Sequence, residues 1–273
     1  MRELVMSTVK RIVIYLSSQV LLKEDHHIDS RMMERLALVV SKLSEQGKEV
    51  VIVTPGAVQV GARQLNVIDI PDNIPAQQVL AAVGQGILSG HYQRLFSYHG
   101  LNVGQVLLPH HLTDQDSDLK NVQVTLETLL LNQIVPIIQQ NISLDTSNWN
   151  PASQEFDHHH FATLVSRWVQ ADLLLVMSQP DGLYMADPHL DPQAHKIDTV
   201  HKVTHSVKEM AKSIQATWPQ AEMIQNLQTA EIILKQHQAM VLINGTDPLN
   251  LLSLFQGKDI GTLFIKKKDL PQP

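Results

Sequence analysis

The sequence contains no cysteine, and this absence excludes two classes of protein. A scaffold held by disulfides is ruled out, and so is catalysis by a thiolate. The lack of cysteine fits a reducing compartment, and we expect a cytoplasmic protein. Charged residues interrupt the first 18 positions, so they do not form the pattern of a secretory signal peptide.

Basic residues are scarce as well. Lys and Arg number 21 against 27 Asp and Glu, which gives a formal net charge of -6. Binding of nucleic acid without sequence preference needs clustered cations, so we expect no nucleic-acid partner. The one basic run, Lys266 to Lys268, is interpreted as a solvated segment. No apolar run reaches the roughly 18 residues of a membrane helix, so we expect no membrane partner.

Short apolar runs alternate with longer amphipathic ones along the 273 residues. The runs predict strands at 11–16, 49–54, 102–108, 134–139, 172–178, 239–244 and 261–265. Helices are predicted from an N-cap at Asp29 to a stop at Gly47, and near 76–99, 117–132, 158–170 and 221–237. Nearly continuous apolar strands separated by helices predict an α/β fold, a three-layer α/β/α sandwich around a mostly parallel sheet.

Ligands of open α/β sheets bind beyond the carboxyl ends of the strands. We therefore expect the loops at 17–19, 55–61, 139–157 and 178–181 to meet at one edge of the sheet. Gly56 and Gly61 flank a strand-to-helix turn and would let backbone N–H groups approach an anion, although a glycine turn without a ligand fits equally well. The segment 179–220 is interpreted as irregular and lid-like.

Several long stretches occur in an order that resembles the amino-acid kinase family, most closely its glutamate 5-kinases, the first enzymes of proline synthesis. They include "VVIVTPGAVQVG", "QQVLAAVGQGILSGHYQRLFSYHGLNVGQVLL", "TLETLLLNQIVPII", "ADLLLVMSQPDGLYMADP" and "NLQTAEI", between about Arg11 and Phe264. The resemblance implies one amino-acid-kinase-like domain over 1–273, without the RNA-modifying-enzyme-like domain that many glutamate 5-kinases carry. It also implies transfer of a phosphoryl group from ATP to a carboxylate.

The same resemblance marks positions where the expected catalytic groups are replaced. The family's first strand carries Lys-x-Gly-Ser/Thr-Ser, where this chain has Tyr15 in place of the lysine and Ser17 in place of the glycine. A second lysine ends a glycine-rich nucleotide loop that aligns with 218–226, with room for a one-residue offset; here it is Asn226, and the glycines are lost. Of the loop Gly-Asp-Asn-Asp only Asp157 remains. Removing one preorganised charged contact costs about 10²–10³ in rate, so we expect negligible phosphoryl transfer.

Substrate and nucleotide contacts are also implied only by the resemblance. The amino-acid side corresponds to Pro55, Gly56, Ala57, Asn141, Ile142 and His158. The nucleotide side corresponds to Ser17, Ser18, Ser178, Gln179, Tyr184 and Met223. In the nucleotide loop, Trp218 and Pro219 replace residues that admit the triphosphate in the family. We expect nucleotide affinity to be weakened together with turnover.

Three consecutive histidines, His158 to His160, follow Asp157. The simplest interpretation is a solvated helix start with Asp157 as its N-cap. A metal site is the alternative, with His110 and His111 as distant partners. Adjacent helical residues point about 100° apart, so three in a row do not face one ion, and we predict no tight metal site here.

These observations favour a glutamate 5-kinase-like protein that has lost phosphoryl transfer and has a binding or regulatory role. Two alternatives remain: an active ATP-dependent kinase for glutamate or another small acid, and a small-molecule or metal-binding module. We expect no cofactor, with ATP and Mg²⁺ required only by an active kinase. We also expect a homo-oligomer, or a hetero-oligomer with a related kinase, formed through the predicted helix 76–99.

Overall fold

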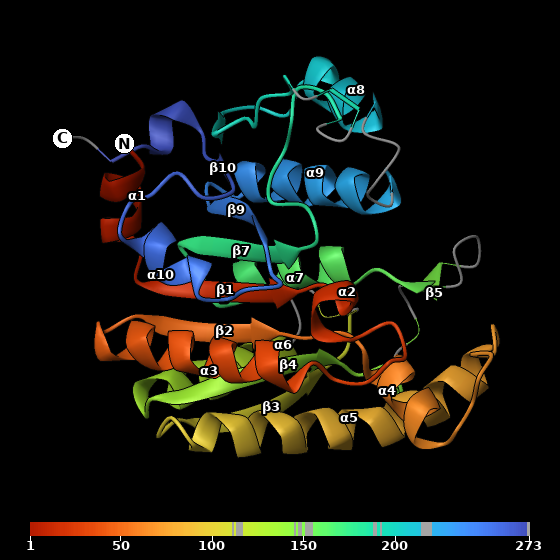
Figure 1. Ribbon diagram of the computed structural model, residues 1–273. Helices are drawn as coiled ribbons and strands as arrows, with labels where there is room; N and C mark the ends of the chain where they lie inside the picture. Colours follow the sequence, from red (N-terminus) through yellow and green to blue (C-terminus); the bar gives the residue numbers. More distant parts are fainter. Residues whose placement is uncertain are drawn as a thin grey trace.

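A computed structural model describes residues 1–110, 112, 117–144, 146, 149–150, 155–187, 190–191, 193–213 and 220–271. An eight-stranded sheet in the order β3-β4-β2-β1-β7-β9-β10-β8 forms the middle layer, and helices cover both of its faces (Figure 1). Neighbouring strands are parallel except β9 and β10. The predicted three-layer architecture is confirmed.

The strands have the following bounds: β1 Arg11–Leu16, β2 Glu49–Val53, β3 Asn102–Leu108, β4 Ile134–Gln140, β7 Leu173–Ser178, β8 Thr199–Val200, β9 Ala239–Asn244 and β10 Thr262–Phe264. A separate two-stranded ribbon pairs β5 (Trp149–Asn150) with β6 (Glu155–Phe156). All seven strands predicted from apolar runs are therefore present.

The helices divide between the two faces of the sheet. One face carries α1 Arg2–Thr8, α2 Ser18–Leu21, α3 Ser30–Glu45, α4 Ala57–Gln64, α5 Ile74–Ser97 and α10 Asn250–Phe255. The other carries α6 Ser117–Leu131, α7 His158–Trp168, α8 His205–Ser213 and α9 Gln220–Lys235. A 3₁₀ turn, Lys267–Asp269, follows the last strand.

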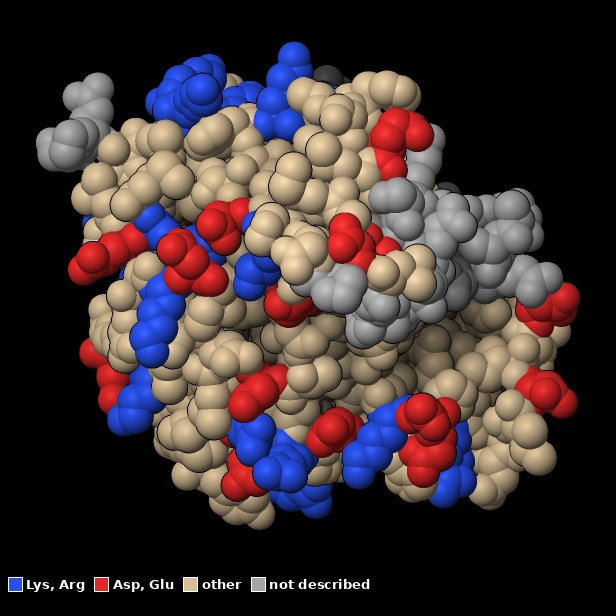
Figure 2. Space-filling view, turned by 45° about the horizontal axis from the view of Figure 1, so that its top comes forward, with Lys and Arg blue, Asp and Glu red and all other residues tan. Residues whose placement is uncertain are grey.

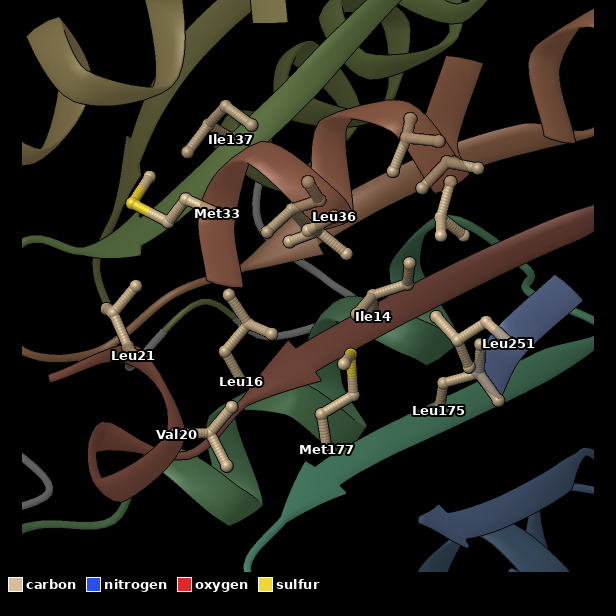
Figure 3. Close-up of a cluster of buried hydrophobic side chains, with 14 of the residues drawn as sticks. Ile14, Leu16, Val20, Leu21, Met33, Leu36, Ile137, Leu175, Met177 and Leu251 are labelled. Atoms are coloured by element: carbon tan, nitrogen blue, oxygen red, sulfur yellow. The ribbon is translucent and has the colours of Figure 1, made fainter. Parts of the chain in front are cut away.

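Strand β1 shows why two separate cores form. Successive side chains of a strand point to opposite faces, so Ile14 enters one core and Tyr15 the other. Ile14 lies in the cluster that contains Leu36 of α3 and Leu175 of β7 (Figure 3). Because both faces of β1 are buried, a nearly continuous apolar run is required at this place in the sequence.

The ends of α3 agree with the sequence in atomic detail. The Asp29 carboxylate accepts hydrogen bonds from the backbone N–H groups of Arg31 and Met32, both at 3.0 Å. Gly47, with a φ of 76°, ends the helix in the left-handed conformation that glycine adopts without strain. Helices α1, α2, α4, α8 and α10 were not predicted. Helix α8 corrects the interpretation of 179–220 as irregular throughout.

The surface in view in Figure 2 carries Lys and Arg side chains interspersed with Asp and Glu. It shows no broad basic patch of the kind that binds phosphate backbones. Of the helices in the described part of the chain, none has the length and apolar content needed to cross a membrane.

Two glycines allow α4 and α5 to approach closely. A Cβ atom added to Gly61 would lie 1.9 Å from the carbonyl oxygen of Leu80, and one added to Gly84 would lie 1.8 Å from that of Ala57. Gly61 lies inside α4 and packs against backbone. The sequence suggested that Gly61 belongs to an anion-binding turn, but its role in the structure is to let the two helices pack closely. Gly56, with a φ of 93°, does precede the helix as expected.

The close packing predicts opposite effects for two alanine substitutions in α5. Gly84→Ala forces α4 and α5 apart, and we expect a loss of about 1–3 kcal/mol in the free energy of unfolding. Gly86→Ala meets no atom within 4 Å and should gain up to about 1 kcal/mol from helix propensity. Urea denaturation of both variants checks this; equal effects of the two substitutions would contradict the packing role.

Candidate functional site

A cavity of about 660 Å³ opens at the carboxyl ends of the central strands. Four loops that leave the strands line it, contributing Ser18, Gly56, Ile142 and Gln179 among other residues. The predicted meeting of these loops at one sheet edge is confirmed for the described residues. Exposed side chains of Lys23, Glu24 and Asp72 also line the cavity, and we call these three the rim.

The cavity gathers some of the candidate residues and leaves others out. It also contains Tyr15, Ser17, Ala57 and His158 in its wall. Seven candidates do not line it: Pro55, Asn141, Asp157, Ser178, Tyr184, Met223 and Asn226. Trp218, Pro219 and His111 lie outside the described residues.

The candidates outside the cavity have other contacts. Met223 is 1% exposed and belongs to the core on the α9 side of the sheet. The Tyr184 hydroxyl donates to the Asp181 carboxylate at 2.9 Å. Pro55 is buried, and the backbone N–H of Asn141 bonds to the carbonyl oxygen of Leu108 at 2.8 Å. The roles that the resemblance implies for these residues stay predictions.

The wall beside β1 is formed by Tyr15 and two histidines. The rings of Tyr15 and His159 meet edge to face at 4.8 Å between centroids. Burial lowers the pKa of His158 and of His159 to about 4, so both rings are neutral at pH 7. The Asp157 carboxylate accepts the backbone N–H of His160 at 2.8 Å, which confirms the N-cap. A solvated helix start is the wrong description of His159, which is 8% exposed.

The third histidine pairs with a neighbouring loop. Nε2 of His110 lies 3.0 Å from Nδ1 of His160, so one ring donates the proton and the other accepts it. Within the described ranges, no three His, Cys, Asp or Glu side chains are grouped to hold a metal ion. The prediction that these histidines bind no metal tightly is left to metal analysis of the purified protein.

A buried carboxylate lies next to this wall. Glu222, in the first turn of α9, is 6% exposed and lines the cavity. Its Oε1 accepts a hydrogen bond from the Ser178 hydroxyl at 2.5 Å, and Ser178 accepts in turn from the Asn226 amide at 3.4 Å. The Glu222 Oε2 atom and the Ser17 hydroxyl are both buried, and Ser17 interacts with the Glu222 carboxylate. We call Ser17, Ser178, Glu222 and Asn226 the Glu222 cluster.

The charge of the cavity is set by carboxylates. Burial raises the pKa of Glu222, and hydrogen bonds from Ser178, from the backbone of Gln179 and from Ser17 oppose that shift in part. Among the described lining residues, Lys23 is the only Lys or Arg, against Glu24, Asp72 and Glu222. Lys212 is the only lysine or arginine whose side chain lies outside the described part. The described lining of the cavity therefore lacks the several cations that usually hold a triphosphate.

Sequence reasoning did not single out Glu222 or the rim. A signal for Glu222 existed, since it stands in the loop where the resemblance predicts glycines. The rim residues come from irregular segments with no pattern of their own, and only the fold brings them to the cavity.

Comparisons with known proteins agree with this architecture. The sequence profile of the amino acid kinase family matches residues 10–244. The chain belongs to the amino acid kinase family. It is 35% identical to glutamate 5-kinase of Listeria monocytogenes over 260 residues, which cover 95% of this chain and 94% of that one. It is 34% identical to glutamate 5-kinase of Enterococcus faecalis over 94% of this chain and 95% of that one.

Two solved structures share the fold at low sequence identity. Carbamate kinase from Giardia lamblia bound to AMP-PNP superposes with a TM-score of 0.66 at 14% identity, covering 96% of this chain and all of that one. Isopentenyl phosphate kinase superposes with a TM-score of 0.63 at 15% identity, over 93% of this chain and 99% of that one. These likenesses establish the fold alone.

The buried carboxylate predicts a pH-dependent stability difference. Because the folded-state pKa of Glu222 is raised, its stability contribution is full below the ordinary glutamate pKa and is lost as pH rises through the folded-state value. Glu222→Gln cannot ionise, so it should melt above the wild type at pH 8, and the gap should shrink toward pH 4.5. Melting temperatures across this range check the prediction; a variant less stable at pH 8 would contradict it.

The neutral histidines predict a change of stability with pH in the opposite direction. The folded-state pKa of His159 is lowered from 6.5 to about 4, so its stability contribution falls as pH drops from 6.5 toward 4. His159→Phe keeps a ring beside Tyr15 without titrating. We expect the variant to lose less melting temperature than the wild type between pH 7 and pH 4.5. An equal loss of melting temperature in the two proteins would contradict a lowered pKa of His159 in the folded state.

Proposed function

We propose that this member of the amino acid kinase family no longer transfers phosphoryl groups and acts as a binding or regulatory protein. The observation that carries the proposal is the Glu222 carboxylate. It lies in the first turn of α9 and lines the cavity. The N-terminus of a helix is the positive end of its dipole and a common site for phosphate. Here the protein's own carboxylate takes that place.

In its ionised form, Glu222 opposes a nucleotide directly. Two like charges about 4 Å apart repel by about 4 kcal/mol at an effective dielectric constant of about 20. Since about 1.4 kcal/mol is a factor of ten, repulsion of this size weakens binding about a thousandfold. Phosphoryl transfer depends on positioning and charge stabilisation. With Tyr15 and Asn226 in place of two lysines, neither lysine is available to offset the repulsion.

The side chains that surround Glu222 support the same proposal. Ser17 and Glu222 stand at or next to positions where the family resemblance predicts glycine, and both are more than nine-tenths buried. A side chain at such a position occupies the volume through which a backbone N–H reaches a phosphate. Asn226, fully buried, donates to Ser178 and does not reach the cavity wall.

An active glutamate 5-kinase is the second candidate. Identities of 34–35% to glutamate 5-kinases over almost the whole chain favour it. In that case ATP and Mg²⁺ would bind at the cavity, and proline synthesis would be the pathway. It requires that the rim lysine, Lys23, or a bound metal ion supplies the positive charge that the two lost lysines supply in the family.

The two candidates predict different results in a coupled assay. With millimolar ATP, Mg²⁺ and L-glutamate, we expect no ADP release above the protein-free rate. Tyr15→Lys alone should also give no ADP release, because the Glu222 carboxylate is still present and the N–H donors to phosphate are still missing. Glutamate-dependent ADP release by the wild type would establish the active kinase instead, provided that an Asp157→Ala variant purified in the same way shows none.

The proposed regulatory role requires association with another protein. A protein without turnover would exert a regulatory effect by binding, and we propose a second copy or a related kinase as its partner. Sedimentation over a hundredfold concentration range tests this. A monomer at every concentration, with no related kinase bound, would count against a role through association.

A further inference from the structure

The cavity keeps the size of a ligand site although its charge is wrong for a triphosphate. Its volume of about 660 Å³ falls within the roughly 300–1,000 Å³ of small-molecule sites. The apolar residues Leu22, Val58 and Ile142 share the wall with polar groups. In a site of this kind the apolar wall holds the carbon skeleton of a ligand, and the polar groups select which ligand binds.

Four glutamines from four elements or loops supply uncharged polar groups to the cavity. The lining includes Gln19 of α2, Gln59 of α4, Gln179 directly after β7 and Gln225 of α9. Two of them are exposed and two are half-buried, so all four retain surface that a ligand can reach. Their side-chain amides form no hydrogen bond with another described residue. Each amide offers an NH₂ group that donates and an oxygen that accepts, so the cavity has free hydrogen-bonding capacity of both kinds.

The charged groups of the lining offer no partner to a charged ligand inside the cavity. His158 and His159 are neutral at pH 7. The Glu222 carboxylate already interacts with Ser17 and Ser178, and its Oε2 atom is buried. The other charges belong to the rim, which is exposed and therefore screened by solvent. A charged ligand would lose its hydration without gaining a counterion, and this cost favours an uncharged one.

We propose that the cavity binds a small uncharged polyhydroxy compound of the sugar class, whose hydroxyl groups bond to the four glutamine amides while its carbon skeleton lies against the apolar wall. A hydroxyl group both donates and accepts, as a side-chain amide does, so the two match without any charge. This inference rests on the proposed loss of phosphoryl transfer, because it assigns the cavity to a ligand that carries no phosphate.

Matched sugars that differ in charge test the proposal. NMR titrations of the wild-type protein at pH 6 compare N-acetyl-D-glucosamine, which is uncharged, with its 6-phosphate and with D-glucosamine, whose amine is protonated. We expect the uncharged sugar to bind at millimolar concentration. The phosphate should bind about tenfold more weakly or worse, because the lining carries a net negative charge. D-Glucosamine should bind no more tightly than the uncharged sugar, because the one buried carboxylate of the lining is already hydrogen-bonded.

Substitutions of glutamines inside and outside the lining locate the ligand. Gln59→Leu and Gln225→Leu should each weaken the uncharged sugar about 2- to 10-fold, the range of one neutral hydrogen bond. Gln64→Leu is the matched control, since Gln64 is exposed on the same helix as Gln59 but does not line the cavity, and it should leave affinity unchanged.

The proposal is overturned if the uncharged sugar fails to bind, or if the phosphate or D-glucosamine binds more tightly than it does. These comparisons use the wild type and need no variant to fold. Undiminished affinity in both Gln59→Leu and Gln225→Leu would also overturn it.

The outcome is separable from that of the proposed function. Glutamate-dependent ADP release would refute the loss of phosphoryl transfer whether or not the sugars bind. Absence of ADP release together with absence of sugar binding would refute only the ligand class proposed in this subsection.

Discussion

The parallel pairing of β1 with β2 on one side and β7 on the other is the constraint on which the cavity depends. Tyr15 is in register with Val53 of β2 and Val176 of β7. One step beyond the end of β1, the N–H of Ser17 bonds to the carbonyl oxygen of Met177 at 2.9 Å. The three strands thus end together, and the loops that follow them share one cavity.

Two glycines of this chain are required by what they contact. Gly61 and Gly84 face backbone carbonyl oxygens at distances that no Cβ atom tolerates, so the packing of α4 on α5 requires them. At the nucleotide side, where the resemblance predicts glycines, the chain has Ser17 and Glu222, which the fold accommodates by burying them. The proposed loss of transfer rests on this contrast: the packing of the scaffold needs its glycines, whereas buried side chains stand where we propose that a phosphate would approach.

The sequence predicts the sheet well because each central strand is buried on both faces and must be apolar throughout. It predicts the edge where the loops meet because parallel strands place their carboxyl ends together. Short helices escape prediction: α10 has only 6 residues, and α8 lies in a polar region without a long apolar period. The hydrogen bonds of the Glu222 cluster were not predicted either. Ser17, Ser178 and Glu222 are far apart in the sequence, and only the packing of β1, β7 and α9 brings them together.

The histidine run shows a further limit of pattern reasoning. The Asp157 cap is a local interaction and was predicted, whereas the burial of His159 depends on Tyr15, more than a hundred residues away in the chain. Because this tertiary contact buries His159, its ring is neutral and forms part of the cavity wall.

Direct calorimetry of ATP with Mg²⁺ tests the central claim most directly. In the absence of glutamate it measures the nucleotide site without any dependence on turnover. We predict no binding to the wild type at millimolar nucleotide, with measurable binding appearing only when Glu222→Gly and Asn226→Lys together restore a glycine and a lysine. A dissociation constant for the wild type below about 100 μM, equivalent to about -5.5 kcal/mol, would contradict the claim that Glu222 closes this site to a triphosphate.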